Sequence, residues 1–295
     1  MRVGFIGCVD SSRAALQTLV KIKGLTVAAV VTRGESAVNA DFCDLTSLCV
    51  ERGIPFHIEN PKDREASVGF LETFDLDVIF CIGWSYLLSE KMLALPRLGV
   101  IGFHPARLPS NRGRHPIIWA LALGLEETAS TFFLMDVGAD SGPIVSQVPV
   151  TIESSDNATR LYEKIIQISQ IQLTEVGANL VSGTVTFTEQ EHSQATYWRK
   201  RGRKDGTIDF RMSAMSIHNL IRALAPPYPG AEFLFDEAHH IVQSSSISPE
   251  SYPINIEPGK VLSKTIDGLL VKTAGSEAIW LYGVEPCDID VGDYL

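Results

Sequence analysis

The first half of the chain alternates short apolar runs with stretches in which apolar residues recur at helical spacing. The apolar runs predict strands, and the periodic stretches between them predict helices, the first of which would be capped by Ser11 or Ser12. This alternation predicts an α/β fold with a Rossmann-like, mostly parallel sheet. Its expected strands lie at 2–7, 25–32, 54–58, 76–84 and 98–103.

The pattern changes after a long predicted helix at 157–183, which Asp156 or Asn157 would cap and Gly183 would end. Residues 191–206 are polar and carry a basic run, so they are expected to link two domains. Beyond them, short apolar runs separated by Gly, Pro and Ser indicate a small, barrel-like β module. We therefore expect an N-terminal α/β domain at 1–190 and a smaller C-terminal β-rich domain at 205–295.

Composition narrows the classes of partner. The net charge of −10 argues against a broad surface for polyanions, so no nucleic-acid partner is expected, although a local pocket for phosphates is compatible with it. The five cysteines form no C-x-x-C pair, which favours reduced thiols over a disulfide frame or a metal site. The start of the chain has no apolar leader, and no apolar run is long enough to span a membrane. We expect a cytoplasmic protein without a membrane partner or a metal.

The stretch GFHPARLPSNRGRHP at 102–116 holds the candidate chemistry. His104 follows an apolar strand end, which is where open α/β sheets bind ligands. Asp140 lies in a Gly-rich loop between two expected strands and is placed to return to the same edge, with Asp136 as the rival partner. A carboxylate beside an imidazole favours the protonated ring and fixes its tautomer, which suits acid–base work. The alternatives are a hydrogen-bonded core histidine and an aspartate that only forms a turn.

Two arginines in the same stretch are candidates for binding an anion. Arg112 and Arg114 flank Gly113, and paired guanidinium groups on a tight loop suit a phosphate or a carboxylate. Asn111 and His115 complete a polar cluster around them. The alternative is a pair of solvated arginines.

The segments FHPARLPSNRGRHPIIWAL (103–121) and TASTFFLMDVGADSGPIVSQ (128–147) resemble the signature of the folate-dependent formyltransferases. The segment 197–233 resembles the start of the C-terminal module shared by the methionyl-tRNA and sugar enzymes of that family. Within the family, LPSNRGRHPIIWAL (108–121) is most similar to the nucleotide-sugar enzymes, including one of a pseudaminic-acid-type pathway. The resemblance implies a transferase that moves the formyl group of N10-formyltetrahydrofolate onto the amine of a UDP- or dTDP-linked amino sugar.

The family has a catalytic set of Asn-x-His followed by Asp, which implies catalytic roles for His104 and Asp140. Gly102 stands where the family has the Asn, whose amide helps to hold the oxyanion formed when the amine attacks the formyl carbon. Three explanations are open. A backbone N–H, a water or another side chain replaces the amide, the glycine makes room for a bulkier substrate, or the protein binds its ligands and turns over poorly.

The resemblance also implies where the ligands bind. The strand end GWSYLL would line the pterin pocket, which the 136–140 loop would close, so the implied folate contacts are Trp84, Tyr86, Leu87, Leu88, Asp136 and Gly138. The implied sugar contacts are Cys8, Asp10 and Ser11 at the first strand end, together with Asn111, Arg112, Arg114 and His115. Members of the family often dimerise, so we expect a homodimer.

Three other functions stay open. A methionyl-tRNA formyltransferase would need a basic surface for RNA, which the charge of −10 does not favour. A formyltetrahydrofolate hydrolase would use the same His/Asp pair and release formate without an amine. A folate or nucleotide-sugar binding protein without turnover is suggested by Gly102.

Overall fold

A computed structural model describes residues 1–35, 40–285 and 288–295. The chain forms two compact units. The first unit comprises Met1–Pro116, Thr128–Val150 and Glu163–Trp198, and the second comprises Ile117–Glu127, Thr151–Tyr162 and Arg199–Leu295.

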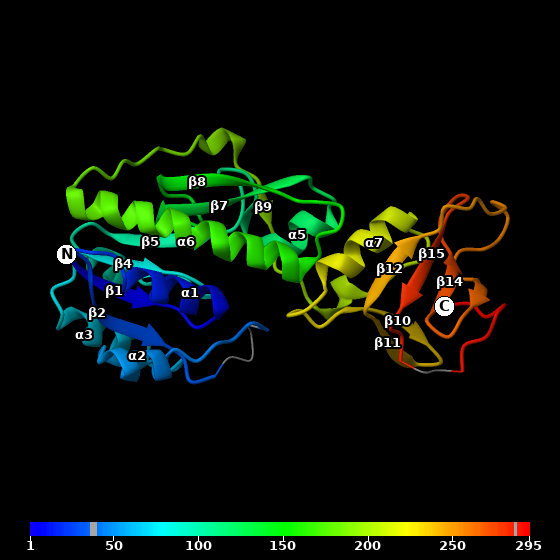
Figure 1. Cartoon of the computed structure of the whole chain (residues 1–295), viewed down its shortest axis with the longest axis horizontal. Coiled ribbons are helices and arrows are strands. Elements are labelled where there is room, and N and C mark those ends of the chain that lie inside the picture. The colour runs from blue at the N-terminus through cyan, green and yellow to red at the C-terminus, as the bar shows by residue number, and fades with distance from the viewer. Residues whose placement is uncertain (36–39, 286–287) are drawn as a thin grey trace. The chain divides into compact units, whose positions relative to one another are not determined.

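The first unit is built on a seven-stranded sheet with the order β3-β2-β1-β4-β5-β7-β8 (Figure 1). All the pairs from β3 to β5 are parallel, and β7 runs antiparallel to β5, so the sheet is mostly parallel as expected. The strands are β1 (Arg2–Ile6), β2 (Thr26–Thr32), β3 (Phe56–Ile58), β4 (Val78–Cys81), β5 (Val100–His104), β7 (Glu127–Leu134) and β8 (Ile144–Thr151).

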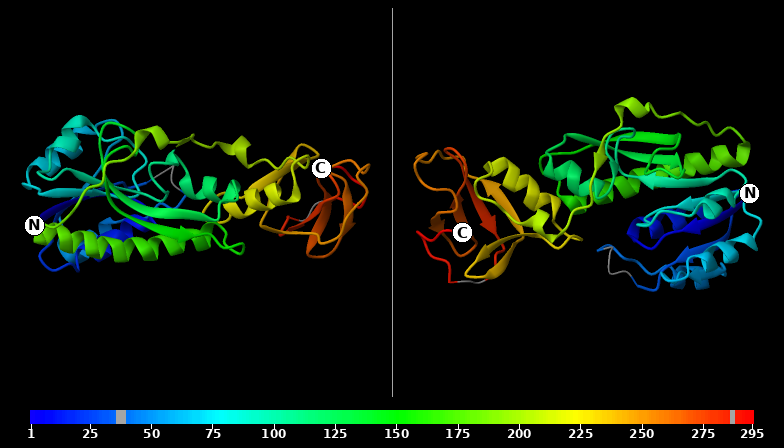
Figure 2. Two further views of the ribbon diagram at one scale, coloured as in Figure 1. Left: turned by 90° about the horizontal axis from the view of Figure 1, so that it is seen from above. Right: turned by 180° about the vertical axis from the view of Figure 1, so that it is seen from behind.

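Helices cover both faces of this sheet (Figures 1 and 2). On one face, leucines of α1 and α6 pack with Val3 and Phe5, and on the other, side chains of α3 and α4 pack with Ile6 and Ile79. Burying each such side chain contributes about 1.5–3 kcal/mol. The helices of the first unit are α1 (Asp10–Leu19), α2 (Thr46–Arg52), α3 (Glu65–Glu72), α4 (Glu90–Ala94) and most of α6 (Ala158–Ser182). Helix α5 (Pro116–Ala122) belongs to the second unit except for Pro116.

Helix α6 ends where the sequence indicated. The Asn157 side chain accepts a hydrogen bond from the Arg160 N–H at 3.0 Å, and Gly183 follows the last turn with a φ of 71°. The expected cap of α1 is wrong, because the helix begins at Asp10 and Ser12 lies inside it. The Ser12 hydroxyl instead accepts from the Cys8 and Val9 N–H groups and donates to the Ile82 carbonyl at 2.6 Å, which joins the ends of β1 and β4.

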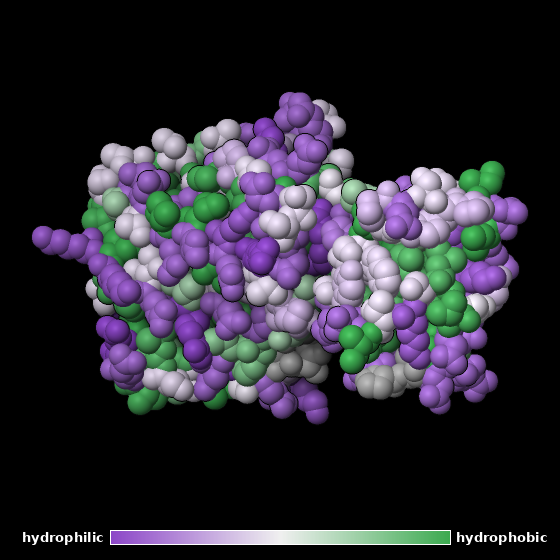
Figure 3. All heavy atoms as spheres, turned by 45° about the vertical axis from the view of Figure 1, so that its right-hand side comes forward, coloured by the Kyte–Doolittle hydropathy of each residue, from purple (hydrophilic) through white to green (hydrophobic). Residues whose placement is uncertain are grey.

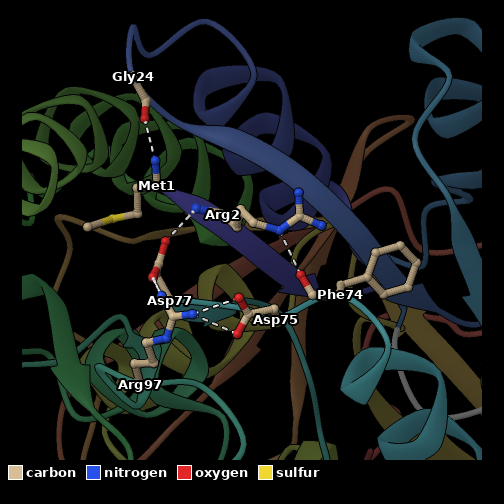
Figure 4. Close-up of polar contacts among 7 residues, drawn as sticks. All are labelled: Met1, Arg2, Gly24, Phe74, Asp75, Asp77 and Arg97. Atoms are coloured by element: carbon tan, nitrogen blue, oxygen red, sulfur yellow. Dashed lines mark hydrogen bonds and ion pairs between the residues drawn. The ribbon is translucent and has the colours of Figure 1, made fainter.

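Polar contacts fasten the opposite edge of the sheet, where the strands begin (Figure 4). Asp77 accepts from the Arg2 N–H at 2.7 Å and from Arg97 at 2.8 Å, and Arg97 also pairs with Asp75 at 2.6 Å. The Met1 amino group donates to the Gly24 carbonyl at 3.0 Å. These contacts join the beginnings of β1, β2, β4 and β5.

The second unit is β-rich, as expected. It contains α7 (Ala214–Ala223), capped by Ser213, whose hydroxyl accepts from the Ser216 N–H at 3.1 Å. Strands β10 (Ala231–Phe235) and β11 (Ala238–Val242) form an antiparallel pair. A four-stranded antiparallel sheet has the order β12-β15-β14-β13, with β12 (Ser244–Ile247), β13 (Val261–Lys264), β14 (Gly268–Lys272) and β15 (Ala278–Tyr282).

The surface seen in Figure 3 carries its apolar side chains in small groups among polar ones. Among the described residues, no helix combines the length and the apolar character that crossing a bilayer would require.

Candidate active site

His104 is the last residue of β5, and its side chain is buried. Its Nε2 lies 2.8 Å from the Asn111 carbonyl oxygen, and its Nδ1 lies 3.6 Å from Asp140 Oδ2. Because a carbonyl oxygen can only accept, Nε2 carries a proton and donates it to Asn111. The other ring nitrogen, Nδ1, therefore faces a carboxylate.

Asp140, not Asp136, is the carboxylate beside His104. Asp140 Oδ2 also accepts from the Gly113 N–H at 2.8 Å, which ties its loop to the 111–114 stretch. Asp136 Oδ1 instead accepts from the Gly138 N–H at 2.9 Å and from the Ser141 hydroxyl at 2.7 Å, so it organises the turn between them. The alternative of a turn-forming aspartate therefore describes Asp136.

Strained backbone surrounds this pair. Asn111, His115 and Asp140 have φ values of 65°, 57° and 54°, in the left-handed region that non-glycine residues seldom adopt. Such conformations cost on the order of 1–3 kcal/mol each and persist only where the surroundings impose them. They are common at functional sites.

A short segment that follows α6 imposes the conformation of residues 111–114. Strand β6 (Arg112–Gly113) pairs in parallel with β9 (Tyr197–Trp198), and the Arg112 N–H donates to the Thr196 carbonyl at 2.9 Å. At residue 113, a Cβ would lie 2.3 Å from the Trp198 carbonyl oxygen, so the strands can approach this closely only with glycine there. The 3₁₀ turn η1 (His192–Gln194) precedes β9.

Arg112 and Arg114 have different environments. The Arg112 guanidinium is buried among Gln190, His192 and Tyr197, so it is not accessible to the anion that we expected it to bind. Arg114 is half-buried, and within the described residues its guanidinium has no hydrogen bond or ion pair. Of the two arginines, Arg114 is the one that is partly exposed, and the half-buried His115 follows it in the chain.

Gly102 lies two residues before His104 in β5 and faces Met135. A Cβ at residue 102 would lie 2.7 Å from Met135 Cγ and 3.0 Å from the Phe133 ring. The volume that an Asn side chain would occupy is therefore already filled.

The stretch after β4 borders a pocket of about 280 Å³. Of the expected folate contacts, Trp84, Leu87 and Leu88 line it, and Tyr86 packs edge-on against Trp84. Asp136 and Gly138 are not among its lining residues, which also include Glu59, Arg64, Glu65, Val68, Ser89 and Met92.

Charged residues that sequence reasoning missed lie beside this pocket. The Arg33 and Arg64 guanidinium groups lie 4.9 and 4.4 Å from the centre of the Tyr86 ring. Burial raises the pKa of Glu59, whose Oε1 makes no hydrogen bond but lies 3.9 Å from Arg64 Nε. For Arg33 and Glu59 the sequence offered one signal, which is that each directly follows an expected strand: Arg33 follows β2 and Glu59 follows β3.

The three residues expected at the end of β1 differ in exposure. Cys8 is buried with its thiol 3.7 Å from the Gly83 carbonyl, Ser11 is buried in α1, and Asp10 is exposed in the first turn of α1. Cys43, Cys49 and Cys81 are likewise buried and free, and burial raises the pKa of Cys49 to about 11. Cys287 lies outside the described residues. Within the described part of the chain, no group of His, Cys, Asp and Glu side chains could hold a metal ion.

His104, at the end of β5 in a mostly parallel α/β sheet, thus faces the Asp140 carboxylate, an arrangement typical of acid–base enzymes. Comparison with known proteins identifies the family. The chain belongs to the formyltransferase family: the formyl transferase domain matches residues 9–176, and the formyl transferase C-terminal domain matches residues 201–289.

Several solved structures share the fold. The sugar 3N-formyl transferase WlaRD, determined in the presence of dTDP and 5-N-formyl-THF, is similar over 97% of this chain and 99% of its own, with a TM-score of 0.73 and 14% identity. An N-formyltransferase from Helicobacter canadensis, in complex with folinic acid and dTDP-3-aminofucose, gives a TM-score of 0.71 at 16% identity over 95% and 98% of the two chains. A 4-N formyltransferase from Francisella tularensis gives 0.67 at 18% identity over 82% and 96%.

Proposed function

We propose that this protein transfers the formyl group of N10-formyltetrahydrofolate to the amine of a UDP- or dTDP-linked amino sugar. The observation that carries the proposal is the buried His104 ring, 3.6 Å from Asp140 at the end of β5, in a chain of the formyltransferase family. Support for the sugar comes from the two full-length structural matches, which were determined with dTDP or a dTDP-sugar and with formylated folates.

The reaction requires one proton to leave the attacking amine and one to reach N10 of the folate. The amine nitrogen bonds to the formyl carbon, the bond from that carbon to N10 breaks, and N10 ends with the proton that the amine lost. Asp140 Oδ2 accepts the hydrogen bond from the Gly113 N–H, and Oδ1 accepts the proton that the amine loses. When Nδ1 is also protonated, the positive charge of His104 stabilises the negative charge that develops on the formyl oxygen.

The residues beside the 280 Å³ pocket fit the chemistry of a folate. A folate carries N–H donors on its pterin, an aromatic ring and a carboxylate tail. Glu59 Oε1 makes no hydrogen bond and is an acceptor for such a donor, and Trp84 and Leu88 supply apolar contact. The Arg64 guanidinium, whose Nε lies 3.9 Å from Glu59 Oε1, suits a carboxylate.

Arg114 is the group that we assign to the phosphates of the nucleotide, with Asn111 and His115 beside it. The unpaired state of its guanidinium within the described residues supports this role, because a partly exposed arginine without a carboxylate is ready to pair with an anion. A cytoplasmic location and a homodimer belong to the same proposal, and light scattering of the purified protein tests the second.

The test is a turnover assay with N10-formyltetrahydrofolate and a panel of UDP- and dTDP-linked amino sugars, analysed by mass spectrometry. We expect one sugar to gain a single formyl group, with loss of the donor in equal amount. The matched control is the same sugar with a hydroxyl in place of the amine, which should gain nothing.

Each other outcome points to one of the open functions. Formate released without an amine would indicate the hydrolase, and formylation of methionyl-tRNA but of no sugar would indicate the tRNA enzyme. Folate binding without any product would indicate a binding protein. The observation that favours this outcome is the packing of Met135 against Gly102, the position at which the family has the catalytic Asn.

A further inference from the structure

The side chain of Gln190 joins the two loops of the site. Gln190 is buried, and its Nε2 donates to the Asp140 carbonyl at 3.0 Å and to the Gly142 carbonyl at 2.6 Å. Its Oε1 accepts from Arg112 Nε at 3.2 Å and Nη2 at 2.7 Å. Both N–H groups and both lone pairs of the amide are therefore used, and each end holds a different loop.

Arg112 is a buried cation without an anion. It is 1% exposed, and its remaining hydrogen bonds go from Nη1 to the Tyr197 hydroxyl at 3.0 Å and from Nη2 to His192 Nδ1 at 3.1 Å. No carboxylate lies within ion-pair distance of it in the described part of the chain. A buried charge lowers the stability of the fold unless it is paired with an opposite charge. Because the Arg112 guanidinium is held only by neutral groups, we look for its role in the residues that it positions.

What these two side chains position is the loop that carries the Asp140 carboxylate. Asp140 has a left-handed φ of 54°, and two hydrogen bonds fix it from opposite ends. Gln190 holds its backbone carbonyl, and the Gly113 N–H, directly after Arg112, holds its carboxylate at 2.8 Å. The Arg112 guanidinium in turn holds Gln190 through its Oε1.

We propose that Gln190 and Arg112 form a positioning pair that sets the distance between Asp140 and His104. Neither side chain touches the His104 ring or the Asp140 carboxylate, so the pair acts through the Asp140 backbone and the Gly113 N–H. The inference rests on the proposed function, because it assigns the pair to the same carboxylate–imidazole site.

The variant that separates positioning from folding is Gln190→Glu. Its carboxylate still accepts from Arg112, so the buried guanidinium keeps a partner, while both N–H donors to Asp140 and Gly142 are lost. We expect kcat to fall about 10- to 100-fold, as for a displaced supporting residue, with KM for both substrates within about 3-fold of the wild type.

The matched control is Gln172→Glu. Gln172 is also a buried glutamine that joins two segments, donating to the Ser130 carbonyl at 3.1 Å and the Ser146 hydroxyl at 2.9 Å, but it touches neither loop of the site. Its kcat per folded molecule should match the wild type. If Gln190→Glu does not fold, Arg112→Lys serves instead, because it keeps the buried charge and loses the fork that holds Gln190.

A double-mutant cycle shows whether Gln190 acts through Asp140. Adding Gln190→Glu to Asp140→Asn should cause no further loss of kcat, whereas an equal loss in both backgrounds would overturn the proposal. An unchanged kcat in Gln190→Glu, or an equal fall in Gln172→Glu, would overturn it too.

A second readout does not depend on turnover. In the wild type the Gly113 amide proton is held by Asp140 Oδ2, so its hydrogen exchange should be slow, and it should accelerate at least 10-fold in Gln190→Glu but not in Gln172→Glu. If the wild type transfers no formyl group but this difference is found, the proposed function fails and the positioning pair stands. Unchanged exchange would overturn the pair whatever the activity.

Discussion

The Met135 side chain fills the space beside Gly102 that any larger residue at that position would need. A Cβ built on Gly102 lies 2.7 Å from Met135 Cγ and 3.0 Å from its Sδ. The glycine and the methionine therefore form one packing unit, and changing either alone leaves a clash or a cavity.

Gly102→Asn should destabilise the protein by about 1–3 kcal/mol, because the added side chain overpacks a buried strand. The double variant Gly102→Asn/Met135→Ala should recover most of that loss, as the shortened side chain vacates the volume. Urea unfolding measures both. Gly69→Asn is the control, since a Cβ at residue 69 meets nothing within 4 Å. Equal destabilisation of Gly102→Asn and the double variant would contradict the packing argument.

Asp140→Asn should lower kcat by about 10²–10⁴-fold, the range for removal of an acid–base group, while thermal unfolding stays close to that of the wild type. Asp136→Asn changes the same chemistry four residues earlier in the chain, at a carboxylate that only organises a turn, and should keep kcat within about 3-fold. Steady-state kinetics with the formylated sugar as product distinguish them. Similar losses in both variants would remove Asp140 from its assigned role.

Glu59→Gln should make the protein more stable at pH 8, and the gain should disappear as the pH falls. Burial raises the pKa of Glu59 in the folded state, so the charged form is disfavoured there relative to the unfolded chain. The penalty is fully present above the folded pKa and vanishes below the unfolded pKa of about 4.3, where the carboxyl is protonated in both states. Urea midpoints at pH 8 and pH 4 measure it, with the exposed Glu65→Gln as control. A gain that persists at pH 4 would rule out titration of Glu59 as its cause.

Ser12→Ala should cost about 1–3 kcal/mol, because it leaves the buried N–H groups of Cys8 and Val9 and the Ile82 carbonyl without the hydroxyl that serves them. Ser182→Ala removes an exposed hydroxyl at the end of α6 and should change stability by less than about 0.5 kcal/mol. Chemical unfolding of the two variants side by side tests this. A loss at residue 12 no larger than at residue 182 would show that the ends of β1 and β4 are held by other contacts.

Much of the fold follows from local pattern. The apolar runs predicted the parallel strands because each strand is covered on both faces, and Asn157 and Gly183 marked the ends of α6 because caps are local. The approach of Asp140 to His104 was expected from the sequence, but strand order does not explain it. Strand β7 runs antiparallel to β5, so Leu134 at its end lies beside Ile101 near the beginning of β5, and the loop that follows has to return toward His104. Asp136 and Asp140 were not separable by pattern, because both are aspartates in one loop.

The environment of Arg112 could not be predicted from its neighbours. Its main partner, Gln190, is 78 residues away in the sequence and belongs to no strand or helix, so no periodicity connects the two. The prediction that Ser11 or Ser12 caps α1 was wrong for a related reason. Ser12 has the residue type of a cap, but its partner Ile82 is 70 residues away, and that contact decided where the hydroxyl points.

The segment from Gln190 to Trp198 has to be synthesised before the site in the first unit can be complete. It is the last part of that unit to be synthesised, yet it supplies the contacts that fix residues 111–114 and the Asp140 loop. A nascent chain that ends before residue 190 contains His104 and Asp140 but lacks the groups that hold their loops. The centre is therefore completed only after Trp198 has left the ribosome, and a proteolytic cut between Gly183 and Gln190 would leave the segment that completes the site joined to the sheet through non-covalent contacts alone on that side.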